Sequence, residues 1–167
     1  MVDAYHEPVL LEESVQGLEI KPEGIYIDAT FGGGGHSRAI LKKLTTGRLI
    51  AFDKDQDAMN NVPNNENFQL IASDFRNVQA KLAEQAISEV DGLLADLGIS
   101  SHQIDIPERG FSTRFDAKLD MRMDVSNGAT ASEVVNEYEE SALRDIMWHY
   151  GELKQSRAIA RAMVEAR

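Results

Sequence analysis

The 167-residue sequence contains no cysteine. This absence excludes disulfides, zinc sites built on thiolates and a thiol nucleophile. A long hydrophobic run is also missing, because no stretch approaches the roughly 20 apolar residues that a membrane-spanning helix needs. The first residues, Met1 to His6, have neither the basic start nor the apolar core of a signal peptide. We therefore expect a cytoplasmic protein that engages no membrane.

Metal-binding patterns and an excess of basic residues are absent as well. The four histidines lie far apart, and no two have the spacing that places two ligands on one helical face, so we expect no metal site. Lysine and arginine number 17 against 28 acidic residues, which gives a net charge of −11. That balance argues against a free-standing nucleic-acid binder. Two local groups of basic residues weaken this argument: Arg109, Arg114, Lys118 and Arg122, and Lys154, Arg157, Arg161 and Arg167. Such groups are, however, more often solvated faces than binding sites.

Glycine is concentrated in one place. An apolar, strand-like run begins at Ile25 and ends at Asp28, and four consecutive glycines occupy positions 32–35 before a helical pattern starts. Glycines allow unusual backbone angles and let a ligand lie against bare backbone, which predicts a cofactor-binding turn. The spacing does not match the dinucleotide fingerprint, because Ser37 or Arg38 stands where its third glycine belongs, and a P-loop would need a lysine that is absent.

Four aspartates indicate which cofactor the turn would bind. Asp28, Asp53, Asp74 and Asp96 each close an apolar run of strand length, so we expect them at the carboxyl edge of one parallel sheet. Taken singly, each is equally typical of a helix N-cap or a turn. Together they would repel a pyrophosphate and suit a cationic ligand with a ribose diol. S-adenosylmethionine fits this description, and the pattern therefore predicts a methyltransferase.

The order of elements predicts an α/β fold with a doubly wound, mainly parallel sheet of the Rossmann-like type. Residues 97–128 are expected to form a long functional loop beside the glycine turn. Thr130 and Glu133 have the spacing of a capping box, and the apolar stripe Leu143, Ile146, Met147 and Tyr150 is expected to pack into a core. Helices are expected over residues 9–18, 37–44, 55–61 and 78–87, and three more after residue 130.

This order predicts a methyltransferase core over residues 1–128, followed by helices over residues 129–167. The sequence stops before the further strands that such a sheet would need, so we expect an incomplete sheet. A fragment would explain this, as would a chain that completes itself with a partner, including a second copy in a homodimer.

Several segments resemble the bacterial small-subunit ribosomal RNA cytosine-N4 methyltransferases, the MraW or RsmH family. They are His6-Glu7-Pro8-Val9-Leu10-Leu11, residues 28–37, residues 91–101, Glu108-Arg109-Gly110-Phe111-Ser112 and residues 119–124. The resemblance implies a class I, S-adenosylmethionine-dependent enzyme that methylates the exocyclic N4 amine of a cytidine in 16S ribosomal RNA, within the small ribosomal subunit. It also implies cofactor contacts from Gly34, Gly35, His36, Asp53, Phe75, Asp96 and Gln103. Residues 129–167 would then be the beginning of the family's helical substrate-recognition insert.

The roles expected at this site follow the same resemblance. Asp53 would accept hydrogen bonds from the ribose hydroxyls, Phe75 would lie near the adenine, and Asp96 is the candidate catalytic residue that accepts from the amine. The chain departs from the family at His102, where proline is usual, and at Leu153, where an acid is usual. For Arg109, Asp120 and Arg122, two alternatives are equal: these residues place RNA or shape the pocket, or they belong to a salt-bridged loop that braces the sheet edge. Two rival functions stay open: a truncated, non-catalytic cofactor-binding module, and, more weakly, a nicotinamide-dependent oxidoreductase.

Overall fold

The computed structural model describes residues 8–167, so His6 and Glu7 of the resemblance lie outside the described part. The chain divides into two compact units, one that extends to His102 and one over Gln103–Arg167. Each unit is described by itself below. The predicted division at residue 129, between a cofactor core and a recognition insert, stays a prediction.

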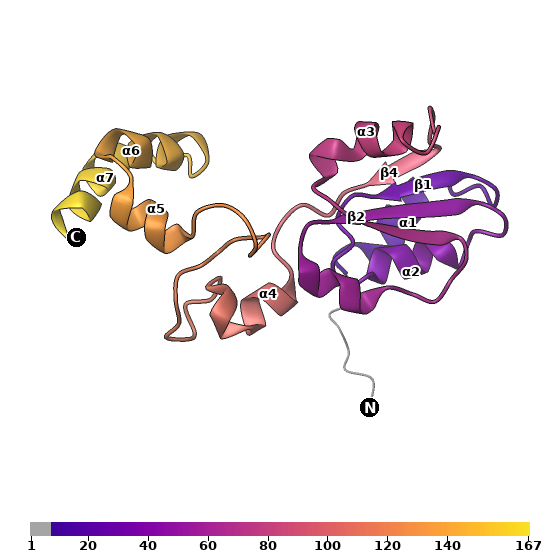
Figure 1. Ribbon diagram of the computed structural model, residues 1–167, viewed down its shortest axis with the longest axis horizontal. Helices are drawn as coiled ribbons and strands as arrows, with labels where there is room; N and C mark the ends of the chain where they lie inside the picture. Colours follow the sequence, from indigo (N-terminus) through magenta and orange to yellow (C-terminus); the bar gives the residue numbers. More distant parts are fainter. Residues whose placement is uncertain (1–7) are drawn as a thin grey trace. The chain divides into compact units, whose positions relative to one another are not determined.

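The first unit is built on a four-stranded parallel sheet (Figure 1). Its strands are β1 (Ile25–Asp28), β2 (Arg48–Asp53), β3 (Phe68–Ala72) and β4 (Gly92–Leu94), in the order β3-β2-β1-β4. The chain moves outward from β1 to β3 and then returns to the other side of β1, which makes the boundary between β1 and β4 the topological switch point. This arrangement confirms the predicted doubly wound α/β fold.

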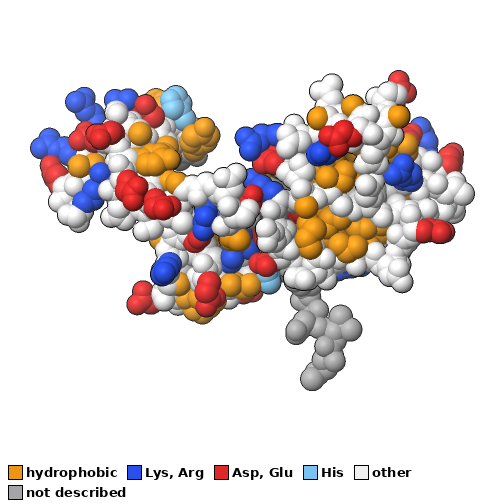
Figure 2. All heavy atoms as spheres, in the orientation of Figure 1, with side chains coloured by type: hydrophobic (Ala, Val, Ile, Leu, Met, Phe, Trp, Pro, Cys, Tyr) orange, Lys and Arg blue, Asp and Glu red, His pale blue; other side chains and the backbone are white. Residues whose placement is uncertain are grey.

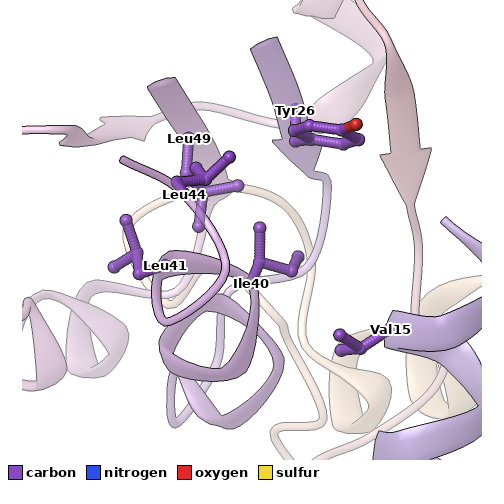
Figure 3. Packing of buried hydrophobic residues seen from close by; sticks show 6 residues of the cluster. All are labelled: Val15, Tyr26, Ile40, Leu41, Leu44 and Leu49. Atoms are coloured by element: carbon purple, nitrogen blue, oxygen red, sulfur yellow. The ribbon is translucent and has the colours of Figure 1, made fainter. Parts of the chain in front are cut away.

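Side chains that alternate along the two central strands pack on opposite faces of the sheet. Tyr26 and Leu49 belong to one buried cluster with Ile40 of α2 (Gly35–Leu41) (Figure 3). Helix α1 (Leu11–Gly17) contributes to the same cluster. Their neighbours in sequence, Ile27 and Ile50, are also fully buried but join a second cluster that includes residues of α3 (Val78–Ala83). Helices therefore cover both faces, and the ends of the strands are left to form a site.

The connecting helices differ from the predicted ones in type and length. The segment expected to be helical over 55–61 is a 3-10 helix, η1 (Gln56–Asn61), which starts at the N-cap Asp55. A further 3-10 turn, η2 (Phe75–Asn77), precedes α3. The predicted helix over 78–87 ends early because Ala86 adopts a φ of 56° and the Ile87 N–H bonds back to the Leu82 carbonyl at 3.0 Å, an arrangement that terminates a helix.

The second unit is helical. It contains the end of α4 (Ser101–Asp105), then η3 (Pro107–Arg109), α5 (Ala131–Glu137), α6 (Glu140–His149) and α7 (Ser156–Glu165). The predicted capping box of Thr130 and Glu133 is present at the start of α5. Helices α6 and α7 pack against each other, and Leu143 of α6 and Ala160 of α7 are both buried.

Two expectations for this unit are wrong. Residues 97–128 are not a continuous loop, because α4 and η3 form within them. The predicted apolar stripe of α6 is buried at Leu143 but not at Tyr150, which is 87% exposed. Tyr150 is the C-cap of α6 and lies just past its last helical residue, and Ile146 of the same stripe is also exposed, at 36%.

Within the described part of the chain, no helix combines the length and apolar character needed to cross a membrane.

Candidate functional site

The predicted glycine turn follows β1 directly and has an unusual backbone. Gly32 and Gly34 have φ angles of 49° and 73°, a conformation that side chains disfavour. The Gly34 N–H bonds to the Phe31 carbonyl at 2.7 Å, and the Phe31 N–H bonds to the Phe52 carbonyl of β2 at 3.0 Å. Among residues 8–167, the N–H groups of Gly33 and Gly35 have no acceptor, so both can donate to a ligand.

Gly34 and Gly35 are also constrained by their surroundings. A Cβ atom at Gly34 would lie 2.7 Å from the Phe31 ring, and one at Gly35 would collide with the ring of Pro8. Both positions therefore need glycine for packing as well as for any close approach of a ligand.

Asp28, at the end of β1, is fully buried and has a structural role. It accepts hydrogen bonds from the Ser37 hydroxyl at 2.6 Å and from the Thr30 N–H at 3.1 Å. Burial raises the pKa of this carboxyl, and the two hydrogen bonds oppose the shift. Its contacts tie β1 to the first turn of α2.

Asp53, at the end of β2, lies next to the glycine turn. Its Oδ2 accepts from the Gly32 N–H at 2.7 Å, and its Oδ1 accepts from the Asp55 N–H at 2.8 Å. Burial raises the pKa of Asp53, opposed by these backbone N–H groups. Each carboxylate oxygen has a second lone pair, so the group can still accept from a ligand hydroxyl.

Asp74 corrects the expectation of a uniformly acidic sheet edge. Its carboxylate pairs with Lys54 at 3.2 Å and with Arg76 at 3.1 Å, and it caps η2 by accepting from the Arg76 N–H. The Arg76 guanidinium and these further partners lower the pKa of Asp74 to about 2. The charge of this aspartate is thus compensated by protein cations and is not left for a ligand.

Asp96 follows β4 on the other side of the switch point. Its side chain is exposed, and its backbone N–H donates to the Thr30 Oγ1 at 2.7 Å. This bond links the segment after β4 to the segment that leads into the glycine turn. Asp96 and the turn are therefore brought together, as the sequence predicted for residues at the two sides of a switch point.

His36 and Phe75 have contrasting environments. His36 lies in the first turn of α2 and is buried, and its Nε2 atom has no hydrogen-bond partner among the described residues. A buried, unpaired ring nitrogen is costly, and a ligand atom or a water would satisfy it. Phe75 begins η2 after β3 and is 41% exposed, so its ring has free surface on which a flat group can stack.

Gln103, the remaining predicted contact, belongs to the second unit. Its side chain is buried, and its Nε2 lies 3.4 Å from the Sδ atom of Met123. In the same unit, Arg109 is buried and donates to the carbonyls of Arg122 and Met123, while Arg122 pairs with Asp120 at 2.7 Å. These contacts all lie within the second unit, so they support a structural role for Arg109, Asp120 and Arg122 there, and whether the loop braces the sheet edge stays a prediction.

Two polar residues at the turn were not predicted. The Arg38 Nη2 donates to the Gly33 carbonyl at 2.6 Å, and the Asn61 Nδ2 donates to the Gly32 carbonyl at 3.1 Å. Asn61 is 29 residues away from Gly32 in the sequence, and no periodicity or motif connects the two.

The residues at this edge fit an adenosine-containing methyl donor better than a metal. Within the described residues, no three His, Asp or Glu side chains are arranged to hold a metal ion. The turn offers unpaired N–H groups, the buried His36 nitrogen lacks a partner, and Asp53 presents a carboxylate for a diol. An ammonium or sulfonium group would also be attracted to the acids of this edge that have no cation paired with them.

Comparison with known proteins identifies the group to which this sequence belongs. The sequence profile of the MraW methylase family matches residues 3–167. The chain belongs to this family. A protein named ribosomal RNA small subunit methyltransferase H from Flavobacterium johnsoniae is 58% identical over 164 residues, which are 98% of this chain and 54% of that protein.

Proteins of the same name from two other bacteria are similarly related. The Bacteroides fragilis protein is 56% identical over 98% of this chain and 54% of its own length, and the Cytophaga hutchinsonii protein is 55% identical over 98% and 55%. The chain thus spans about half the length of the curated relatives it matches. The resemblance that the sequence motifs predicted is confirmed at the level of the family.

Proposed function

We propose that this chain binds S-adenosylmethionine at the glycine turn and belongs to an enzyme that methylates the N4 amine of a cytidine in 16S ribosomal RNA. The observation that carries the proposal is the glycine turn at the switch point, with unpaired N–H groups beside the Asp53 carboxylate and no lysine in the turn. The names of the relatives support a ribosomal RNA substrate. Such a substrate would be met in the cytoplasm, within or before the assembled small subunit.

Each residue of the edge has a proposed task. Asp53 accepts from the ribose hydroxyls, Phe75 stacks near the adenine, and the residues of the turn, Gly34, Gly35 and His36, contact the rest of the donor. Gln103, which lies in α4, is proposed as a further contact to the donor, as the family resemblance implies. When bound, S-adenosylmethionine would supply an electrophilic methyl group to the amine nitrogen, with S-adenosylhomocysteine as the leaving group and the amine proton passing to an acceptor.

Asp96 is proposed as the acceptor for an N–H of the cytosine amine. Because the lone pair of this amine is delocalised into the ring, a carboxylate that withdraws the proton makes the nitrogen a better nucleophile. The sequence has no cysteine for the covalent adduct that methylation of pyrimidine carbon-5 ordinarily uses, which favours the exocyclic amine. The base would have to leave its stack to reach this edge.

Titration calorimetry tests the cofactor assignment with the chain as it stands. We expect S-adenosylmethionine and S-adenosylhomocysteine to bind, and NADH and ATP not to bind. Asp53→Asn should weaken the binding of S-adenosylmethionine by about tenfold or more, since it removes a charge-assisted hydrogen bond. Asp91→Asn is the matched control, because Asp91 also accepts from a backbone N–H, that of Ile25 at 3.0 Å, but at the opposite end of the sheet.

Binding of a phosphate-bearing nucleotide in place of the sulfonium compound would overturn the assignment. Methyl transfer to isolated small ribosomal subunits, measured with a labelled donor, separates the two remaining functions. Transfer to cytidine N4 that is lost in Asp96→Ala supports the enzyme. Binding without transfer supports a cofactor-binding module, and the chain's coverage of half of its relatives' length is the reason to test for it.

A further inference from the structure

The backbone of the glycine turn is held in place by side chains from two neighbouring elements. The Gly32 peptide groups are fixed on both sides: Asp53 accepts from the N–H at 2.7 Å, and Asn61 donates to the carbonyl at 3.1 Å. Asn61 is the last residue of η1, and Asp53 also accepts from the N–H of Asp55, which caps the start of η1. Both side chains that hold Gly32 are therefore connected to η1, one at its start and one at its end.

Arg38 adds a second link between the same partners. From the second turn of α2, its Nη2 donates to the Gly33 carbonyl at 2.6 Å, and its Nη1 donates to the backbone carbonyl of Asn61 at 3.2 Å. The guanidinium lies over the turn, since a Cβ atom built on Gly34 would meet Nη1 at 2.8 Å. A planar fork can serve two carbonyls at once, which a lysine cannot do in the same way.

These contacts determine the direction of the Gly33 N–H group, one of the two unpaired N–H groups of the turn. A trans peptide is planar, so the Gly32 carbonyl and the Gly33 N–H point in opposite directions. When Asn61 holds the carbonyl, the Gly33 N–H is turned away from η1 and left without a protein acceptor among the described residues. Arg38 fixes the next peptide in the same manner, and its N–H, that of Gly34, bonds to Phe31 at 2.7 Å.

We propose that Arg38 and Asn61 are positioning residues that keep the Gly33 N–H presented to the methyl donor. This inference rests on the proposed function. Glycine is the most flexible residue, so a run of four would sample many conformations without such contacts, and ordering the run on binding would cost affinity. The two side chains remove that cost before the ligand arrives.

The test compares variants that alter one hydrogen bond each. Asn61→Asp replaces the donating amide with an acceptor of the same shape, and Arg38→Lys keeps the charge but loses the fork. We expect each variant to bind S-adenosylmethionine and S-adenosylhomocysteine at least about fivefold more weakly in titration calorimetry. Arg48→Lys is the control, because Arg48 also makes two contacts, to Gln69 at 3.3 Å and Gln85 at 3.1 Å, but extends from the start of β2.

A second measurement separates positioning from general stability. The thermal midpoint of each ligand-free variant should stay close to that of the unchanged chain, while amide exchange at Gly33 becomes faster in Asn61→Asp and not in Arg48→Lys. Asn61→Ala serves in the same role if Asn61→Asp does not fold. Unchanged affinity in the Arg38 and Asn61 variants overturns this inference alone, whereas a failure of the unchanged chain to bind either compound overturns the proposed function as well.

Discussion

The aspartates at or just after the ends of the four strands have four different environments. Asp28 is fully buried, Asp53 is partly buried and bonded to backbone, Asp74 is paired with two cations, and Asp96 is exposed. The pKa of Asp28 is raised by burial and that of Asp74 is lowered by its partners. These residues therefore have opposite effects on the pH dependence of stability.

Replacement of Asp28 with asparagine tests the direction of its pKa shift. Because the folded pKa is raised, the stabilisation from protonated Asp28 is present below the unfolded value of 3.8 and is lost as the pH rises through the folded value. The amide in the variant would keep an acceptor for the Thr30 N–H without ionising. The free energy of unfolding of Asp28→Asn relative to the unchanged chain should therefore increase from pH 3 to pH 8.

Urea unfolding at a series of pH values measures this difference. Asp116→Asn, at an exposed position, controls for the loss of one acid. A difference that decreases with rising pH would mean that the bonds from Ser37 and Thr30 outweigh burial, and the assigned direction would be wrong.

At the scale of elements, short 3-10 helices organise the sheet edge. η1 holds the glycine turn through Asn61, and η2 is started by Asp74, which accepts from the Arg76 N–H at 2.9 Å. Because Phe75 is the first residue of η2, the cap made by Asp74 also fixes the backbone from which the Phe75 ring extends. The edge thus depends on local capping as much as on the strands.

Two substitutions at Asp74 separate its cap from its charge. Asp74→Asn retains an acceptor for the Arg76 N–H, whereas Asp74→Ala removes both the cap and the charge. At pH 7 we expect Asp74→Ala to lower the free energy of unfolding by about 1 kcal/mol or more, with a smaller loss for Asp74→Asn. Urea unfolding gives both values.

The difference in free energy of unfolding between Asp74→Asn and the unchanged chain should change with pH in the direction opposite to that expected for Asp28→Asn. A lowered folded pKa stabilises the fold above the unfolded value of 3.8, and this contribution is lost as the pH falls towards about 2. The gap between Asp74→Asn and the unchanged chain should therefore close in this window. A gap that persists at pH 2 would show that the carboxylate charge is not its source.

The sheet and its site edge could be predicted because their signals are local in the sequence. Apolar runs that end in aspartates, and a glycine run after the first of them, correctly indicated four parallel strands and the switch point between β1 and β4. The helix type at η1 and the early end of α3 before the positive φ of Ala86 were missed, since both depend on backbone geometry that propensity does not encode. Arg38 and Asn61 were missed because a bond from a side chain to a distant carbonyl leaves no pattern in the sequence.

At the scale of the whole molecule, the net charge of −11 constrains how the chain can meet RNA. Several arginines of the second unit are already paired within it, including Arg114 with Asp105, Arg144 with Asp145 and Arg161 with Glu165. Acidic and basic side chains alternate over the face of each unit that Figure 2 shows. This pairing reduces the number of cations in the second unit that are available for contacts to RNA phosphates.

This charge distribution predicts a weak dependence of RNA binding on salt. Each phosphate contact to a single strand adds about −0.7 to the slope of log K against log salt, so about three contacts would give a slope of about −2. Fluorescence anisotropy with a labelled 16S ribosomal RNA fragment, between about 50 and 200 mM salt, measures this slope for the chain. Neutralising Lys154 and Arg157 to glutamine together should flatten it by about 1.4, if both contact phosphates. A slope several times steeper than about −2 would require a basic surface that the pairing of these arginines does not provide.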